Sequence, residues 1–419
     1  GSTAEIKSET GRMLITYNDG TDNIVPVTNI QPSNKILVNK TFTLTGTNTA
    51  TGMATGDGLV MPYKVGLKYT STFSDGQIHY YIKRTTTNEN VTVNYVITPE
   101  PGKTEDDYKN QTVPGNDTYT GYTHGTFKNG KKYTEMVTGV FPALKTDQTI
   151  KFNLIIQFPD NNENQDSEKG KTFNGKVVVN YEPPKPKTFA EDTWETIADN
   201  TSSNVYKVGD TKKVLIGNKP YTVRIANKST PTECNDSNFS QTACGFVVEF
   251  VDIVENRKMN STGTNVGGWR DSEMRTYANG AFFNSLPEEL RNVIKSTKVV
   301  SGHGSSDKNA NRADGNWESE DKIYLLSAHE VWTGKIIVNE KEIDTALNNT
   351  RQLDYYVERV TTNNRSGAIK KNNGSSSAWW LRGAASNFNS YFFFVDYTGD
   401  WNYTIAYLDH GFAPAFRIG

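Results

Sequence analysis

The sequence predicts a multi-domain, β-rich protein: an N-terminal all-β sandwich or jelly roll over residues 1–181, then a mixed α/β (α+β) domain over residues 189–419. Three observations support this division. The segment 182–188 contains three prolines, which favour an extended polyproline II linker. All seven tryptophans and both cysteines follow that linker. Before it, the hydrophobic pattern has the two-residue period of strands, and helical patterns occur only after it.

The N-terminal domain is predicted to consist of strands joined by tight turns. Strand-like segments include 79–82, 91–96 and 150–156, and several such segments alternate apolar and polar residues, as in a sheet with one face in water. Asn-Gly pairs at 129–130 and 174–175 stand next to strand-like segments, which is a strong hairpin signal. Residues 157–179 resemble the last two strands of TasA- and camelysin-like surface and biofilm-fibre domains of Firmicutes. Residues 1–35 are expected to form an edge strand or a strand donated to another copy.

After the linker, strands are predicted at 205–216, 221–225 and 245–253, together with two helices. The first helix, over 271–280, begins with acidic residues and ends at Gly280. The second, over 285–295, has Ser285 as its N-cap, an early proline, two first-turn glutamates and a late lysine. The polar stretches 301–320 and 361–377 are predicted to be loops.

The composition excludes several classes of protein. With 35% hydrophobic and 22% charged residues, the chain can form folded cores, and global disorder is not expected. A formal net charge of −2 argues against nucleic-acid binding by the whole protein. No apolar run approaches the roughly 20 residues of a membrane-spanning helix. No signal peptide is visible, and Gly1-Ser2 is typical of a cloning remnant, so we expect an extracellular, cell-surface or phage-borne protein made without its export segment.

The residues that usually carry catalysis or bind metals form no recognisable motif. Cys234 and Cys244 could form one disulfide or remain two buried thiols. The five histidines are far apart and lack the spacing of metal ligands, and no G-x-S-x-G motif frames a nucleophile. The acidic run 160–169 lacks the glycine and the terminal glutamate of an EF-hand, so it is interpreted as a solvated hairpin tip. We therefore predict a protein that is not an enzyme and has no cofactor and no metal; a structural calcium ion bound by acidic residues of the tail is possible but not predicted.

The C-terminal segment 379–416 has the composition of a binding surface. Its 38 residues include 13 aromatic residues, no lysine, and a single arginine at 382. Tyr and Trp give large, rigid contact areas, while Asn and Ser adapt their hydrogen bonds. Eight residues are predicted to be core: Trp379, Trp380, Leu381, Phe392, Phe394, Val395, Pro414 and Phe416. Seven that stand among Asn, Asp and Gly are predicted to be exposed: Asn387, Asn389, Tyr391, Tyr397, Asn402, Tyr403 and Tyr407.

A series of motifs resembles, in order, a domain found in Firmicutes surface proteins: 207–212, 242–250, 268–275, 285–290, 325–330, 379–383 and 411–418. The end of this series resembles the C-type lectin-like fold of formylglycine-generating enzymes and of the variable proteins of diversity-generating retroelements. The resemblance implies a domain whose C-terminal strands and loops face a ligand. Formylglycine-generating enzymes use a cysteine pair near the end of the fold, whereas Cys234 and Cys244 lie early, so the resemblance does not imply that activity. The calcium-binding Glu-Pro-Asn and Gln-Pro-Asp triplets of sugar-binding lectins are absent.

Retroelements vary adenines, typically within AAY codons, and many residues of the tail belong to the set that such codons can produce. Scaffold residues are spaced between them, among them Trp380, Arg382, Trp401 and Pro414. The candidate variable, ligand-binding residues are Asn387, Phe388, Asn389, Ser390, Tyr391, Phe393, Asp396, Tyr397, Asp400, Asn402, Tyr403, Thr404, Ile405, Tyr407, Leu408, Asp409 and His410.

The sequence therefore predicts a surface-displayed binding protein whose hypervariable C-terminal face recognises a protein or glycan on another cell or phage. The alternative is a structural, fibre or adhesin component of fixed specificity that assembles through strand exchange of the N-terminal β domain.

Overall fold

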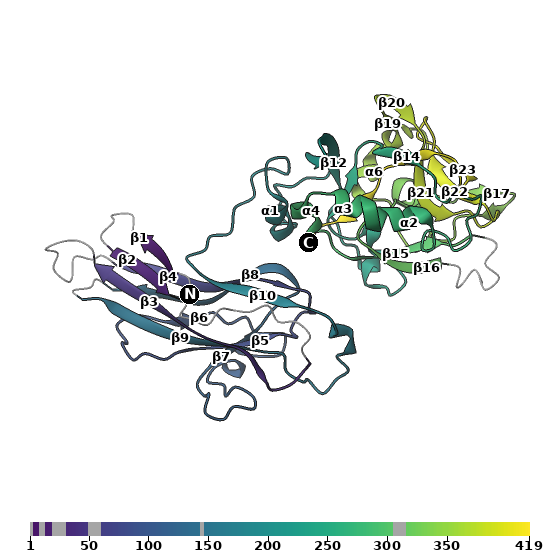
Figure 1. The fold of residues 1–419 in the computed structure, drawn as a ribbon. Helices are drawn as coiled ribbons and strands as arrows, with labels where there is room; N and C mark the ends of the chain where they lie inside the picture. The colour runs from purple at the N-terminus through teal and green to yellow at the C-terminus, as the bar shows by residue number, and fades with distance from the viewer. Residues whose placement is uncertain (1–2, 8–12, 19–30, 49–59, 143–145, 305–315) are drawn as a thin grey trace. The chain divides into compact units, whose positions relative to one another are not determined.

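The computed structural model describes residues 3–7, 13–18, 31–48, 60–142, 146–304 and 316–419. The chain forms two compact units, Gly1–Pro183 and Pro184–Gly419, and the boundary between them falls inside the proline-rich segment 182–188 (Figure 1). Part of the predicted edge or donated strand in 1–35 lies outside the described residues. Each unit is described by itself below.

The N-terminal unit consists of two antiparallel sheets. One sheet has six strands in the order β1-β2-β3-β9-β5-β7, and the other has four in the order β10-β4-β8-β6. Among its described residues this unit has no α-helix, only short 3-10 turns. The strands are β1 (Thr3–Lys7), β2 (Met13–Asn18), β3 (Ile36–Asn48), β4 (Met61–Ser71), β5 (His79–Arg84), β6 (Asn94–Tyr95), β7 (Thr123–Thr126), β8 (Gly130–Phe141), β9 (Gln148–Gln157) and β10 (Phe173–Val179).

Both sheets contribute one face to a common core. On β4, Tyr63, Val65 and Leu67 are buried, while the residues between Met61 and Ser71 that point the other way include Pro62 and Lys64. On β9, Phe152, Leu154 and Ile156 enter the same hydrophobic cluster from the other sheet. The alternation of side chains along a strand therefore produces the buried layer.

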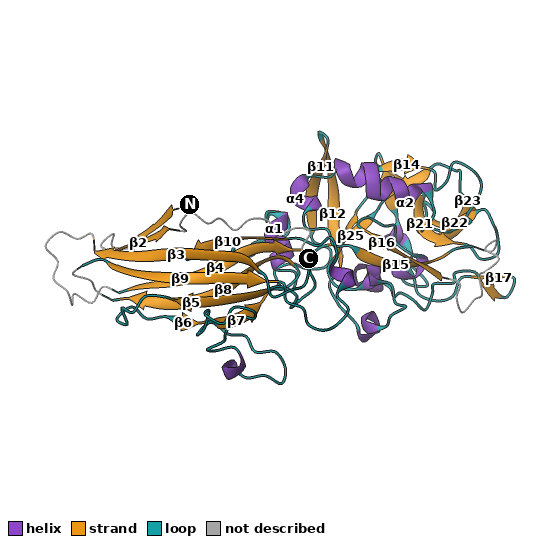
Figure 2. Ribbon diagram, turned by 60° about the horizontal axis from the view of Figure 1, so that its bottom comes forward, coloured by secondary structure: helices purple, strands orange, loops and turns teal. Residues whose placement is uncertain are grey.

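The C-terminal unit is mostly β, with short helices around its sheets (Figure 2). Four strands form the sheet β11-β12-β13-β25, five form the sheet β14-β24-β21-β22-β23, and three further pairs form two-stranded sheets. The strands are β11 (Thr211–Ile216), β12 (Lys219–Asn227), β13 (Val247–Phe250), β14 (Glu255–Arg257), β15 (Thr297–Gly302), β16 (Asn316–Asp321), β17 (Ile337–Val338), β18 (Lys341–Glu342), β19 (Lys370–Asn372), β20 (Ser375–Ser377), β21 (Trp379–Ala384), β22 (Tyr391–Val395), β23 (Trp401–Ile405), β24 (His410–Phe412) and β25 (Ala415–Arg417). The helices are α1 (Trp194–Asp199), α2 (Glu273–Tyr277), α3 (Phe283–Ser285), α4 (Glu288–Arg291), α5 (Ala328–Val331) and α6 (Asp354–Arg359).

The mostly β, multi-sheet character that the sequence predicts is confirmed, but the helix boundaries differ from the prediction. The first helix does not stop at Gly280, because α2 continues through a π-helical stretch, Ala278–Phe282, into α3, whereas the second is shorter than predicted. Helix α2 starts after Ser272, whose side chain accepts a hydrogen bond from the Arg275 N–H at 3.0 Å. Helix α4 starts after Pro287 rather than at Ser285, and it ends at Arg291. The apolar residues beyond it leave the helix because Ile294 forms a β-bridge with Ile418. Similarly, the strand predicted over 205–216 begins only at Thr211.

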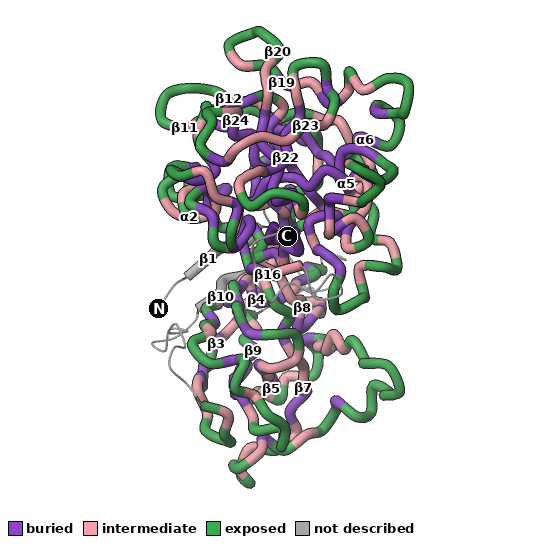
Figure 3. Tube along the Cα trace, turned by 90° about the vertical axis from the view of Figure 1, so that its right-hand side faces the viewer, coloured by how far each residue is buried: buried purple, intermediate pink, exposed green. Residues whose placement is uncertain are grey.

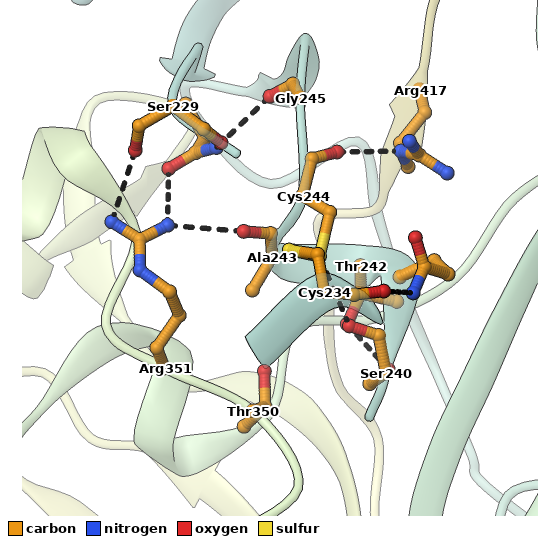
Figure 4. The surroundings of a disulfide bond; sticks show 12 residues. Ser229, Cys234, Ser240, Thr242, Ala243, Cys244, Gly245, Thr350, Arg351 and Arg417 are labelled. Atoms are coloured by element: carbon orange, nitrogen blue, oxygen red, sulfur yellow. Dashed lines mark hydrogen bonds between the residues drawn. A yellow bond between two sulfur atoms is a disulfide. The ribbon is translucent and has the colours of Figure 1, made fainter. Parts of the chain in front are cut away.

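A disulfide bond joins Cys234 to Cys244, ten residues further along the chain (Figure 4). Two arginines brace the segment around Cys244. Arg417 donates from Nε to the Cys244 carbonyl at 2.7 Å, and Arg351 donates from Nη1 to the Ala243 carbonyl at 3.0 Å. The bridge therefore closes a loop whose far end is held against β25.

Candidate functional site

The hairpin of β22 and β23 carries most of the predicted binding residues. Its strands are antiparallel, with Tyr391 opposite Ile405, Phe393 opposite Tyr403, and Val395 opposite Trp401. Because cross-strand partners point to the same side of a sheet, these six side chains share one face. In Figure 3, β22 is mostly buried, whereas β23 is intermediate or exposed.

On this face lies a continuous row of aromatic rings, here called the aromatic row: Phe388, Tyr391, Tyr403 and Trp401. Ring centroids are 4.6 Å apart for Phe388 and Tyr391, 5.3 Å for Tyr391 and Tyr403, and 6.0 Å for Tyr403 and Trp401. Such spacings are typical of attractive aromatic pairs. Phe388 is 41% exposed, and the other three rings are partly exposed. The row therefore presents apolar ring surface and two phenol groups on a rigid strand pair.

Phe393 was predicted to be a variable surface residue, and the structure corrects this: its side chain has no exposed surface. Its ring lies over Gly383 of the neighbouring strand β21, where a Cβ atom would stand 3.0 Å from Phe393 Cδ2. Trp401 and Tyr403 flank the ring, each with its centroid 6.4 Å away. Because Gly383 leaves room for the ring, Phe393 is a core residue that supports the aromatic row from below.

All other predicted variable residues reach the surface. Nine are exposed: Asn387, Phe388, Asn389, Tyr397, Asp400, Asn402, Tyr407, Leu408 and Asp409. Ser390, Tyr391, Asp396, Tyr403, Thr404, Ile405 and His410 have intermediate exposure.

The structure does not bring all of these residues onto one face. Asn402 and Thr404 stand opposite Phe394 and Phe392, so they point to the other side of the hairpin from the aromatic row. His410 packs on that other side, with its ring 4.9 Å from Trp380 and 4.5 Å from Phe394. Burial among these rings lowers the pKa of His410 below its ordinary value.

The turn between β22 and β23 is held by its own polar groups. Asp396 Oδ1 accepts hydrogen bonds from the Thr398 N–H at 2.9 Å and the Asp400 N–H at 3.1 Å. Gly399 has a φ of 88°, and a Cβ there would stand 2.0 Å from the Arg365 carbonyl oxygen. The Asp400 carboxylate also pairs with Arg365 at 3.2 Å. This turn leaves Tyr397 68% exposed at the tip.

The predicted scaffold residues lie beneath this surface, with one exception. Trp380 and Arg382 have no exposed surface, and Pro414 is buried. The Trp380 indole N–H donates to the Arg257 carbonyl at 2.8 Å. Trp401 is the exception, because it is partly exposed and belongs to the aromatic row.

A buried ion pair anchors β21 behind the site. Arg382 binds Glu330 of α5 through two hydrogen bonds, from Nη1 to Oε1 at 2.6 Å and from Nη2 to Oε2 at 2.9 Å, and both side chains are fully buried. Thr350 also donates to Glu330 Oε2 at 2.6 Å. Burial alone would raise the pKa of Glu330, but the Arg382 guanidinium and the hydroxyl donors hold that pKa below its ordinary value. The pair is thus charged, and it ties β21 to α5.

Sequence reasoning missed Asn265, which positions the loop before β22. Asn265 is fully buried, and its Nδ2 donates to the carbonyls of Phe388 and Tyr391 at 2.8 Å each and of Ala385 at 3.3 Å. Its backbone N–H donates to the Asn389 carbonyl at 2.9 Å. The neighbouring Gly263 lies against the other end of the hairpin, where a Cβ would stand 2.7 Å from Ile405 Cδ1. The only signal in the sequence is a polar, glycine-rich run, which does not reveal a partner more than a hundred residues away.

The described part of the chain contains no group of three or more His, Cys, Asp or Glu side chains that could hold a metal ion. Within the same residues, no helix is long and apolar enough to span a membrane.

Searches of curated proteins and of solved structures find no match to this chain. Residues 246–419, which include Asn265, Arg382, the aromatic row and its turn, match the model of a family described as a domain of unknown function (DUF6273).

Proposed function

We propose that the C-terminal unit is a ligand-binding domain of a surface-displayed protein, and that the aromatic row with its flanking loops is the binding face. The observation that carries the proposal is the partly exposed aromatic row itself, since exposed aromatic clusters on soluble proteins are characteristic of interaction sites. Tyr397 and Tyr407, which are 68% and 44% exposed, extend the face on both sides. Asn387 and Asn389 add adaptable hydrogen-bonding groups.

The support beneath the face suits binding by a preformed surface. Asn265 holds the loop that carries Phe388, and Asp396 holds the turn that carries Tyr397. A rigid face loses little conformational entropy on binding, which favours affinity. The expected ligand is a protein or a glycan on another cell or phage.

We further propose that the face is diversified by a retroelement and that its frame is a C-type lectin-like domain. The support is the pattern of exposure: of the candidate variable residues, only Phe393 is buried. Exchanges at exposed positions cost little stability, whereas exchanges in a core cost about 1–5 kcal/mol. The Cys234–Cys244 bridge is consistent with an extracellular location, where disulfides persist.

The encoding DNA tests the diversification directly. We expect a non-coding near-copy of the 3′ end close to the gene, differing only where the copy has adenine, beside a reverse-transcriptase gene. The differences should fall in codons of exposed residues such as Tyr397 and Tyr407 and spare the codon of Phe393. A gene without such a copy would refute diversification.

Replacing Tyr391, Tyr397, Asn402, Tyr403 and Tyr407 together by serine tests the geometry of the face. The variant should stay folded, as judged by its near-UV circular dichroism and its thermal transition. Collapse of the C-terminal transition would show that these side chains are core residues, and the binding face would then be misplaced.

A further inference from the structure

The N-terminal unit contains a cavity, which is a separate site from the aromatic row. It has a volume of about 720 Å³ and is lined by residues of β4, β5, β7 and β8 together with the segment 96–101. This volume is within the range of ligand pockets, roughly 300–1,000 Å³. The cavity lies at the side of the unit where the edge strands β7 and β6 terminate the two sheets.

The cavity exists because the edge strand β6 is too short to cover β8. Only Asn94 and Tyr95 pair with β8, opposite Thr138 and Val137, and the Val96 N–H adds one bond to the Met136 carbonyl at 2.9 Å. After Val96, none of the residues 97–101 has a backbone hydrogen bond to β8 among the described residues, and all five line the cavity. Residues 132–135 of β8 therefore border the cavity on this side instead of a strand.

The backbone of β8 faces this cavity with free edge groups. Asn180 and Thr72 form ladder bonds between β10 and β4, from the Asn180 N–H to the Lys64 carbonyl at 2.9 Å and from the Thr72 N–H to the Thr172 carbonyl at 2.9 Å. Backbone groups alternate between the two neighbours of a strand, so Leu67 and Tyr69 of β4 face β8, where they stand opposite Thr134 and Lys132. The N–H and C=O groups of Tyr133, which stands between Lys132 and Thr134, then point away from β4, and they have no backbone partner among the described residues.

The walls combine hydroxyl, aromatic and charged groups. Tyr69 and Tyr80 form part of the lining. The Tyr108 hydroxyl accepts a hydrogen bond from the Glu100 N–H at 3.1 Å, which holds the segment 96–101 in place. Glu100 and Glu135 supply negative charge, and Lys128 and Lys132 supply positive charge. Within the described residues, none of these four charged side chains has an ion-pair partner.

We infer that this cavity binds an extended peptide of mixed charge, which pairs with the β8 edge at Tyr133 and continues the line of β6. Addition of a strand to an exposed edge gives affinity through main-chain hydrogen bonds, while side-chain pockets give specificity. An unpaired edge beside a cavity of this size fits that mode. The three lining carboxylates, of Asp75, Glu100 and Glu135, and the two lysine ammonium groups select peptide side chains of both signs.

The peptide comes from another protein rather than from a second copy of this chain. Every described strand of this chain already has a partner in its own unit, including β1 and β2, which pair with each other and with β3. No described strand is left over to be donated.

Peptides selected on the full-length protein from a phage-displayed library of random heptapeptides test the inference. Thr98 is exposed, lines the cavity and makes no hydrogen bond among the described residues, so Thr98→Trp fills the cavity without breaking a contact. Thr118→Trp is the matched control, because Thr118 is equally exposed but lies outside the cavity. Selected peptides should bind Thr98→Trp at least about tenfold more weakly than wild type and bind Thr118→Trp unchanged.

Strand addition has a second signature in the peptide. Two versions of a selected peptide are compared, one N-methylated at its odd-numbered residues and one at its even-numbered residues. One version should lose binding and the other should keep it nearly intact, since only alternate amides face the β8 edge. Equal effects of both alternations would overturn strand pairing, and so would a selection that yields no peptide sensitive to Thr98→Trp. Binding of a glycan array that depends on Thr98 would show a different ligand class. Self-association of the full chain that Thr98→Trp abolishes would show that the strand comes from a second copy.

Discussion

Replacing Asn265 by alanine should destabilise the C-terminal unit and release the loop that carries Phe388. The substitution removes three hydrogen bonds, to the carbonyls of Ala385, Phe388 and Tyr391. The Tyr391 carbonyl keeps a second donor, the Ala385 N–H at 3.0 Å, and is therefore not left unpaired. The Phe388 carbonyl loses its side-chain donor, and the Ala385 bond, at 3.3 Å, is the longest of the three.

The magnitude follows from these partners. One newly unsatisfied buried carbonyl costs about 1–3 kcal/mol, and the two remaining bonds contribute about 0.5–1.5 kcal/mol each. Against this, Asn265 Oδ1 is buried without a partner among the described residues, and its removal offsets part of the loss. The net expectation is a loss of about 2–3 kcal/mol in the free energy of unfolding, or about 5–10 °C in Tm for a unit of this size.

Differential scanning calorimetry of the full chain measures the loss, and hydrogen exchange of the amides from Phe388 to Tyr391 reports the release of the loop. Asn387→Ala is the matched control, because Asn387 is exposed and makes no hydrogen bond among the described residues. A loss below about 0.5 kcal/mol, which is typical of a surface substitution, would refute the role of Asn265. Unchanged amide protection would refute it equally.

Four further predictions test other parts of the structure. Arg382→Leu leaves Glu330 buried without its counter-charge, so it should cost about 3–5 kcal/mol, and the double variant with Glu330→Leu should cost less; denaturant unfolding of both decides this. Phe393→Ala should cost about 3–5 kcal/mol, whereas Tyr397→Ala should stay within about 0.5 kcal/mol, and equal losses would contradict the assignment of core and face. Burial lowers the pKa of His124 from 6.5 to about 4, and it also lowers the pKa of the neighbouring His79, which Glu100 raises and Lys103 lowers. Between pH 6.5 and pH 4 the unfolded chain therefore binds more protons than the folded chain, so the free energy of unfolding falls as the pH drops, by at most about 3 kcal/mol for His124. Urea unfolding of His124→Gln should show a shallower pH dependence than wild type. Replacing Cys234 and Cys244 by serine should cost about 2–3 kcal/mol for this ten-residue separation, and an unchanged Tm would mean that the bridge constrains little.

The sequence predicts the aromatic tail well wherever one residue's neighbours in the chain decide its environment. Trp379, Phe392, Phe394 and Phe416 stand in apolar runs and are buried, while Tyr397 and Tyr407 stand among Asn, Asp and Gly and are exposed. Phe393 fails this reasoning because β22 is buried on both faces near its middle. Its second face is covered through Gly383 on the adjacent strand, a partner that no local pattern reveals.

Helix lengths fail for a related reason. The run 285–295 has the caps and the apolar period of a helix, but a bridge between Ile294 and Ile418 uses its last residues as the edge of a sheet. The free energy of that tertiary contact exceeds the small intrinsic preference of a short helix. The role of Asn265 likewise depends on tertiary structure, since its side chain donates to carbonyls of a loop that begins at Ala385.

The two candidate sites differ in what the chain supplies around them. At the aromatic row, Phe393 beneath, Asn265 beside and Asp396 at the tip all hold side chains in place, so exchange of the exposed residues leaves the frame intact. At the N-terminal cavity, the backbone of Tyr133 offers the proposed contact, and backbone recognition does not depend on which side chains stand there. A face that tolerates variation and an edge that recognises main chain suit opposite tasks. Under the functions proposed above, the first would change its ligand from copy to copy, whereas the second would keep one mode of attachment.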